Sequence, residues 1–159
     1  MRFGGVGIQG SRAYDLVITV AAGSATYQSD TPSNSGCSSN GLFARIRMKV
    51  GSSATLDLTF RDSSTDAPVT VDGFHLVFFD LDSNNGIQQR VSPTGFAAYD
   101  LHASTTLTMS GAASSPTFKG GAQNTASMDP TNMNTATKRS AVNLYYESTS
   151  SFQVTLRAR

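Results

Sequence analysis

The run of residues 80–86 has the side chains best suited to binding an ion. Asp80, Asp82 and Asn84 place oxygen-bearing side chains at alternate positions, and a loop that wraps such oxygens around a hard cation is typical of Ca²⁺ sites. The run departs from an EF-hand loop, because Gly86 falls one place late and the twelfth position is Val91 instead of glutamate. The same residues suit a polar hairpin turn in which the aspartates accept hydrogen bonds from turn amides. The sequence therefore leaves a weak calcium candidate beside an ordinary turn.

The other reactive residue types form no recognisable catalytic or metal motif. His75 and His102 are the only histidines and Cys37 is the only cysteine, whereas a zinc site needs three or four such ligands. Neither histidine has a motif neighbour that would make it a general base. The sequence also contains no G-x-S-x-G, H-E-x-x-H or P-loop pattern. We therefore expect a protein that is not an enzyme and that holds no cofactor, apart from the calcium candidate.

A glycine pattern near the start of the chain fits a nucleotide-binding motif without the setting that the motif requires. Residues 5–10 read Gly-Val-Gly-Ile-Gln-Gly, but G-x-G-x-x-G binds a dinucleotide only between a strand and a helix. No helical pattern follows here. We expect residues 1–12 to form a flexible or packing arm instead of a nucleotide site.

Alternating apolar and polar residues indicate strands along most of the chain. In residues 54–60, Leu56, Leu58 and Phe60 occupy every second position, which is the period of a strand with one buried face. Residues 74–81 are apolar on both faces and predict a central strand covered on both sides. Comparable patterns predict further strands at residues 14–20, 42–50, 87–91, 96–101, 105–109, 141–147 and 152–156.

Turn-forming residues separate these segments and indicate the fold class. Asp, Asn, Ser, Gly and Pro gather at short intervals between the strand patterns, and strands spaced in this way are typical of a β-sandwich. We predict an all-β protein with a single antiparallel, jelly-roll-like sandwich domain over residues 1–159. Two long loops, residues 22–41 and 119–139, interrupt the pattern, and residues 129–131 suit one turn of helix.

Composition and charge exclude several classes of function. The 159 residues are 38% hydrophobic and 14% charged, with a formal net charge of +1. No apolar run reaches the ~20 residues of a membrane-spanning helix. The basic residues within 45–49 alternate with apolar ones, which indicates a solvated strand face more than a nucleic-acid patch. Because the net charge is low, copies of the chain repel one another little, and self-association is permitted.

Several segments resemble one known kind of domain. Residues 62–70, 74–82 and 95–99, with weaker agreement at 128–130 and 138–142, are similar to a β-rich domain that recurs in diatom and dinoflagellate proteins. The resemblance extends to the diatom pyrenoid shell proteins, which assemble into a protein sheet around the Rubisco-filled compartment of the plastid. It implies a structural building block located in the plastid, with no catalytic residues to carry over.

One departure from that domain bears on the calcium candidate. Relatives often carry an acidic residue shortly after the Phe-Asp-Leu-Asp turn, where this chain has Gln88, Gln89 and Arg90. The resemblance therefore does not extend calcium binding to this chain.

Together these observations favour a non-catalytic structural protein whose copies assemble into an ordered sheet, shell or filament, because exposed sheet edges can pair between copies. The expected partners are copies of the chain itself, with no nucleic acid and no membrane span. The alternative is a Ca²⁺-dependent carbohydrate-binding or adhesion module, which would bind polysaccharide through Asp80, Asp82 and Asn84 in an extracellular location. The expected assembly surface comprises the two long loops and five basic residues, Arg45, Arg47, Lys138, Arg139 and Arg157.

Overall fold

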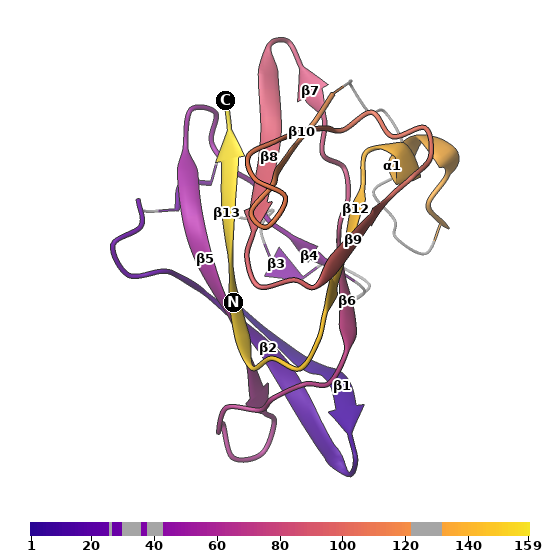
Figure 1. Cartoon of the computed structure of the whole chain (residues 1–159). Coiled ribbons are helices and arrows are strands. Elements are labelled where there is room, and N and C mark those ends of the chain that lie inside the picture. The colour runs from indigo at the N-terminus through magenta and orange to yellow at the C-terminus, as the bar shows by residue number, and fades with distance from the viewer. Residues whose placement is uncertain (26, 30–35, 38–42, 122–131) are drawn as a thin grey trace.

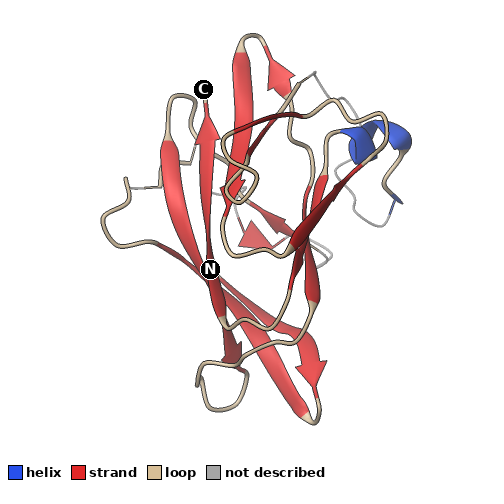
Figure 2. Cartoon of the chain, viewed as in Figure 1, coloured by secondary structure: helices blue, strands red, loops and turns tan. Residues whose placement is uncertain are grey.

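The computed structural model describes residues 1–25, 27–29, 36–37, 43–121 and 132–159, drawn in colour in Figure 1. Over these residues the chain consists of β-strands and connecting loops, with one short helix (Figure 2). All pairs between these strands are antiparallel, so the predicted all-β class is confirmed. In chain order the elements are β1 (Arg2–Gln9), β2 (Arg12–Val20), β3 (Gly36–Cys37), β4 (Ala44–Arg45), β5 (Ser53–Asp62), β6 (Phe74–Phe78), β7 (Ser83–Asn84), β8 (Ile87–Pro93), β9 (Ala98–Leu101), β10 (Thr108–Ser110), β11 (Thr117–Lys119), α1 (Thr135–Arg139), β12 (Val142–Tyr146) and β13 (Ser151–Ala158).

Apart from β3 and β4, which pair with each other as a separate two-stranded sheet, the strands form a large and a small sheet that share one core. The large sheet has the order β1-β2-β5-β13-β8-β11-β10, with β7 paired to β8 beside this path, and the small sheet has the order β6-β12-β9. Figure 1 shows β5, β13 and β8 side by side, with β6, β9, β12 and α1 grouped beyond them. Buried side chains of both sheets belong to one hydrophobic cluster, which makes the fold sandwich-like. A jelly roll distributes eight strands over two sheets, and the unequal division found here does not confirm that detail.

Strict alternation along β5 gives the large sheet one buried face. Every second residue from Ala54 to Asp62 is buried, and the residues between them are half-buried. In β13, Phe152 and Val154 are buried in the same way, and Val154 lies directly opposite Leu56 of β5. The residues that alternate with these core residues form the opposite face of the sheet, which we call the outer face.

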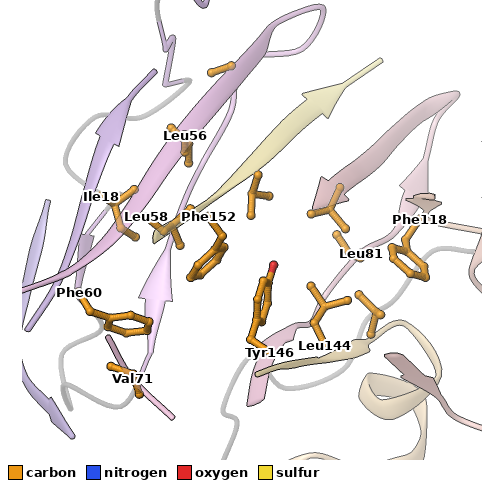
Figure 3. Packing of buried hydrophobic residues seen from close by; sticks show 14 of the residues in the cluster. Ile18, Leu56, Leu58, Phe60, Val71, Leu81, Phe118, Leu144, Tyr146 and Phe152 are labelled. Carbon is orange, nitrogen blue, oxygen red and sulfur yellow. The ribbon is translucent and has the colours of Figure 1, made fainter. Parts of the chain in front are cut away.

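Aromatic rings join the two sheets at the centre of the core, where Figure 3 shows Tyr146 close to Phe152. The ring centroids of Tyr146 in β12 and Phe152 in β13 are 4.4 Å apart, and Phe74 of β6 stacks on Tyr146 at 5.0 Å. Phe74 also meets Phe60 of β5 edge-on at 4.9 Å. Aromatic pairs of this kind contribute ~0.5–1.5 kcal/mol each beyond the burial of their area. These contacts fix the small sheet against the large one.

The first residues of the chain form the outermost strand of the large sheet. β1 pairs with β2, and the turn between Gln9 and Arg12 contains Gly10 at a φ of 63°. Only the first of the two turn residues has a positive φ, which matches the type II′ turn that suits a two-residue hairpin. Of the two alternatives expected for residues 1–12, a flexible or a packing arm, the structure has the packing one, in the form of a strand paired with β2. The glycine pattern forms a strand and its turn, and its many glycines hid the alternation that would have indicated a strand.

Asp15 of β2 holds a bulge in β1. The pairing register of the two strands shifts midway along β1, where Gly5 takes a φ of 63°. The Asp15 carboxylate accepts hydrogen bonds from Arg2 Nε at 2.7 Å, from the Gly5 amide at 2.9 Å and from the Ser63 hydroxyl. The bonds from Ser63, Gly5 and Arg2 stabilise the charged carboxylate and lower its pKa from 3.8 to about 2.

The predicted strand at residues 42–50 is much shorter than expected. Within the described residues only Ala44 and Arg45 form a strand, β4, which pairs with β3. Ile46 and Met48 pack against the core from an irregular segment. The alternation correctly predicts that Ile46 and Met48 face the core, but Ala44 and Val50, expected on the same face, are exposed. Among the described residues, the segment has no neighbouring strand with which its backbone could pair over its whole length.

The predicted central strand at residues 74–81 is an edge strand. It ends at Phe78, pairs only with β12 within the described residues, and exposes 43% of Val77. Asp80 takes a φ of 63°, which lies outside the extended region and ends the strand before this residue. The prediction treated residues 74–81 as one strand with apolar residues on both faces. In the structure, Phe79 and Leu81 lie after the end of the strand, in an irregular segment, so they are not part of either face.

The remaining predicted strands are confirmed within three residues at either end. The turn of helix suggested at residues 129–131 lies outside the described residues, as do parts of both long loops. Within the described part of the second loop, α1 begins after Asn134, whose side chain accepts a hydrogen bond from the Thr137 amide at 3.0 Å. This N-cap satisfies an amide that the short helix leaves unpaired.

Removing the Tyr146 hydroxyl should stabilise the protein. Tyr146 is fully buried, and among the residues that the structure describes its hydroxyl has no hydrogen-bond partner. Burial raises the pKa of this hydroxyl. An unsatisfied buried hydroxyl carries a desolvation penalty of ~1–3 kcal/mol. We expect Tyr146→Phe to raise the free energy of unfolding in urea by about 1 kcal/mol, whereas Leu144→Ala in the same strand should lower it by about 2–5 kcal/mol. A Tyr146→Phe variant less stable than the wild type would contradict this description of the core.

The Asp15 network should make stability depend on acid pH. Because its pKa is lower in the folded protein, at about 2, than the ordinary 3.8, its contribution is complete above pH 3.8 and disappears as the pH falls through 2. We expect Asp15→Asn to reduce the Tm at pH 6 and to flatten the fall of Tm between pH 4 and pH 2, measured by calorimetry. Parallel pH profiles of variant and wild type would show that Asp15 is not responsible.

Candidate functional site

The calcium candidate lies where the chain passes from the small sheet to the large one. β7 and β8 form a two-residue hairpin, with Asn84 paired to Ile87 across the turn. Asn85 and Gly86 both have positive φ, at 51° and 79°. This is the pattern of a type I′ turn, for which Asn-Gly is the preferred sequence. Asn84 therefore belongs to an exposed β-hairpin, and the hairpin interpretation accounts for residues 83–87.

Asp80 has an unusual electrostatic setting. Burial and the neighbouring charge of Asp82 raise its pKa from 3.8 to about 6, and the nearby Arg45 guanidinium opposes that rise. The structure thus brings Asp80 and Asp82 close enough to repel one another, as a cation site would require. However, Arg45 already supplies a positive charge beside Asp80, which weakens any attraction for Ca²⁺.

The backbone carbonyl of Asp82 takes part in the hydrogen bonding of the large sheet. It accepts a hydrogen bond from the Gln89 amide at 3.0 Å. Gly120 lies so close that a Cβ atom there would collide with the same carbonyl group. Among the described residues, no group of three or more His, Cys, Asp or Glu side chains is placed to hold a metal ion. The arrangement favours a packed hairpin over a calcium loop.

The five basic residues expected on an assembly surface lie in two regions. Arg45 is close to Asp80, and its Cζ lies 6.0 Å from the centroid of the Phe43 ring. Lys138 and Arg139 end α1 near the same corner, because the adjacent Ser140 carbonyl accepts a hydrogen bond from the Leu81 amide at 3.0 Å. Arg157 lies elsewhere, on the outer face of β13. Arg47 belongs to the irregular segment that follows β4.

Arg139 acts mainly as an anchor for the preceding loop. Its Nε donates to the Ser104 carbonyl at 2.8 Å, and its own carbonyl accepts from the Thr106 amide at 2.9 Å and from the Thr105 hydroxyl at 3.0 Å. These bonds tie α1 to the connection between β9 and β10. A residue engaged in this way stabilises the fold, and its exposure alone does not make it a partner contact.

The structure also reveals a cationic group that the sequence analysis missed. Lys119 of β11 lies directly opposite Arg90 of β8, and Arg90 lies directly opposite Arg157 of β13. We call these three residues the cation row. They are 29, 67 and 38 residues apart in pairs along the chain, so only the strand register brings them together. Alternation alone would have placed each on an outer face but could not have aligned them.

A row of hydroxyl side chains runs beside the cation row on the same face. Ser92 lies opposite Thr155, and Thr155 lies opposite Thr55. The hydroxyl oxygens of Ser92 and Thr117 are 2.7 Å apart, and those of Thr55 and Thr155 are 2.8 Å apart. We call these four residues the hydroxyl row. They cover the outer face with side chains that can both donate and accept hydrogen bonds.

One apolar hollow opens between the edge of the large sheet and the segment after β4. Its volume is about 400 Å³. Its lining is mostly apolar and carries no Asp, Glu, His, Lys, Arg or Cys side chain. It is lined by Met1, Ile18, Thr19, Val20, Tyr27, Ile46 and Leu56.

Comparison with known proteins gives no family assignment. Protein-family models, curated proteins and solved structures were each searched, and none matches the chain. A separate structural finding concerns membranes: over the part of the chain that is described, no helix is long and apolar enough to cross one.

The two neighbours of Asp80 should move its pKa in opposite directions. We expect Asp82→Asn to lower the pKa of Asp80 below its value of about 6, and Arg45→Gln to raise it, because Asp82 disfavours and Arg45 favours the charged form. Carboxyl chemical shifts followed by NMR during a pH titration measure both changes. Unchanged titration in both variants would contradict the arrangement. A fall of the Asp80 pKa on adding millimolar CaCl₂ would favour the calcium interpretation over the hairpin.

Proposed function

We propose that the protein is a non-catalytic structural protein whose copies associate by pairing the free edge of β1. The observation that carries this proposal is the state of that edge. β1 is the terminal strand of the large sheet, and no described strand pairs with its outer side. A free strand edge presents unpaired amide and carbonyl groups, which are a template for a strand from another chain.

The side chains of β1 favour contact with a second copy. Ile8 is 74% exposed and Val6 is 45% exposed, whereas edge strands that avoid association usually carry charges. The only charged residue of β1 is Arg2, and its guanidinium already bonds to Asp15 and Asp66, each at 2.7 Å. Beyond Arg2, the exposed side chains of the strand, Val6 and Ile8, are apolar and uncharged.

The position of the hairpin leaves this edge accessible. In Figure 1 the hairpin of β1 and β2 extends beyond the small sheet at the lower end of the molecule. The bulge near Gly5 interrupts the regular edge, so we place the intermolecular pairing at the straight part, Gly7 to Gln9, next to the turn. An antiparallel pair of two β1 strands about a two-fold axis would join two large sheets into one.

An extended assembly needs a second contact besides the β1 pair, because a two-fold contact alone closes into a dimer. The outer edge of β6 in the small sheet is a suitable second contact, since Val77 exposes 43% of its surface there. Low net charge, at +1, keeps repulsion between copies small. The resemblance of residues 62–70, 74–82 and 95–99 to the algal β-rich domain supports the same proposal. Calcium-dependent carbohydrate binding through Asp80, Asp82 and Asn84 is less favoured, because Arg45 lies beside Asp80.

A lysine on the β1 edge should weaken association. We expect the wild type to form dimers or larger particles as its concentration rises, measured by sedimentation velocity and by negative-stain electron microscopy. Ile8→Lys should raise the concentration needed for association at least tenfold, because a charge would be buried at the contact. The matched control is Val50→Lys, which alters a residue that is 55% exposed and lies away from the strand edges.

Two outcomes would contradict this proposal. If the wild-type protein stays monomeric at high protein concentration and at every salt concentration, it is not a self-assembling structural protein. If Ile8→Lys and the wild type associate equally, the protein assembles through another surface and the β1 edge is not the contact.

A further inference from the structure

No acidic residue lies directly opposite a member of the cation row in the strand register. Asp57 of β5 shares the outer face, but it lies opposite Gln153 and accepts a hydrogen bond from that side chain at 2.8 Å. Like charges directly opposite one another destabilise a strand pair, yet Lys119, Arg90 and Arg157 follow one another across three adjacent strands. Within the described residues, the recorded ion pairs involve Arg2 and Arg61 and none of these three cations. The protein therefore maintains three aligned, uncompensated positive charges that folding alone does not require.

The geometry concentrates these charges. Neighbouring strands lie ~4.8 Å apart, so the three Cα atoms span about 10 Å. Arg159 adds a fourth cation next to the row, because its backbone pairs with Gln88, two residues before Arg90. Residues two apart share one face of a strand, which places Arg159 on the same face as Arg157. Arg90 Nε is also buried and lacks a hydrogen-bond partner among the described residues.

The neighbouring hydroxyl row suits an oxygen-rich ligand. Its members alternate with buried residues such as Val91 and Val154, so their side chains lie on the outer face beside the cations. They are held in pairs by hydrogen bonds between Ser92 and Thr117 and between Thr55 and Thr155. Paired hydroxyls keep free acceptor and donor capacity for a further partner. Neither row contains an aromatic residue.

We propose that the outer face of the large sheet binds an anionic polysaccharide, with its sulfate or carboxylate groups on the cation row and its sugar hydroxyls on the hydroxyl row. Guanidinium groups bind such oxyanions through paired hydrogen bonds. The absence of aromatic residues from both rows disfavours single-stranded nucleic acid, which stacks its bases on such side chains. A flat sheet face also lacks a protruding helix or ribbon that could enter the major groove of a duplex. This inference uses a different surface from the β1 edge and does not depend on self-association.

Binding of dextran sulfate tests the proposal, with uncharged dextran and a DNA duplex of equal total charge as comparison ligands. We expect the wild type to bind dextran sulfate, more weakly as salt increases, and not to bind dextran. The double variant Arg90→Gln/Arg157→Gln should bind at least tenfold more weakly. The control Arg12→Gln/Lys138→Gln removes the same charge from two exposed residues outside the row and should change binding less than twofold.

The variants can be checked for folding, because relief of repulsion between opposed arginines should leave the Tm equal or higher. If the double variant does not fold, Arg157→Gln alone, at an exposed position, should still weaken binding at least threefold. The proposal is overturned if the wild type does not bind dextran sulfate, or if the control pair loses as much affinity as the row. Equal or tighter binding of the DNA duplex would also overturn it, in favour of a nucleic-acid partner.

Discussion

The contact between Tyr146 and Phe152 is the interaction on which the rest of this structure depends. Their ring centroids lie 4.4 Å apart, and they come from the two different sheets. Around them, Phe74 and Phe60 extend the same aromatic cluster toward the β1–β2 hairpin, where Tyr14 meets Phe60 at 5.5 Å. Because a three-stranded sheet has little apolar surface of its own, its stability comes from this cluster. By joining the two sheets, this cluster also positions the segment around Asp80, where the chain passes from one sheet to the other, and the outer face of the large sheet.

Burial of one face leaves the other face of the large sheet free to carry chemistry. The strict alternation of β5 and β13 sends apolar residues inward and hydroxyl, amide and charged residues outward. The outer face is thus a regular array in which strand register decides which side chains become neighbours. The cation row and the β1 edge lie on the same sheet but at different places, so one scaffold can present a contact for copies and a contact for a ligand.

Much of this architecture follows from the sequence, because apolar residues occupy every second position of β5 and β13. That period of two predicts a strand with one buried face. β1 could not be predicted in the same way, since its glycines contribute no alternation and its bulge depends on Asp15, a residue of the next strand. The prediction that β6 is a central strand was wrong for a related reason. Apolar residues on both faces do not show that the backbone at Asp80 leaves the extended region. The cation row was hidden altogether, because no local pattern aligns Lys119, Arg90 and Arg157 before the register is known.

The central claim is that the free edge of β1 pairs with a second copy of the chain. Hydrogen–deuterium exchange measured at low and at high protein concentration tests it most directly, because it reads the protection of individual amides. The account predicts that amides in Gly7 to Gln9 gain protection as the concentration rises, while amides of β5, already paired on both sides with β2 and β13, do not change. Unchanged exchange of β1 at a concentration where particles have formed would contradict the claim and would place the contact elsewhere.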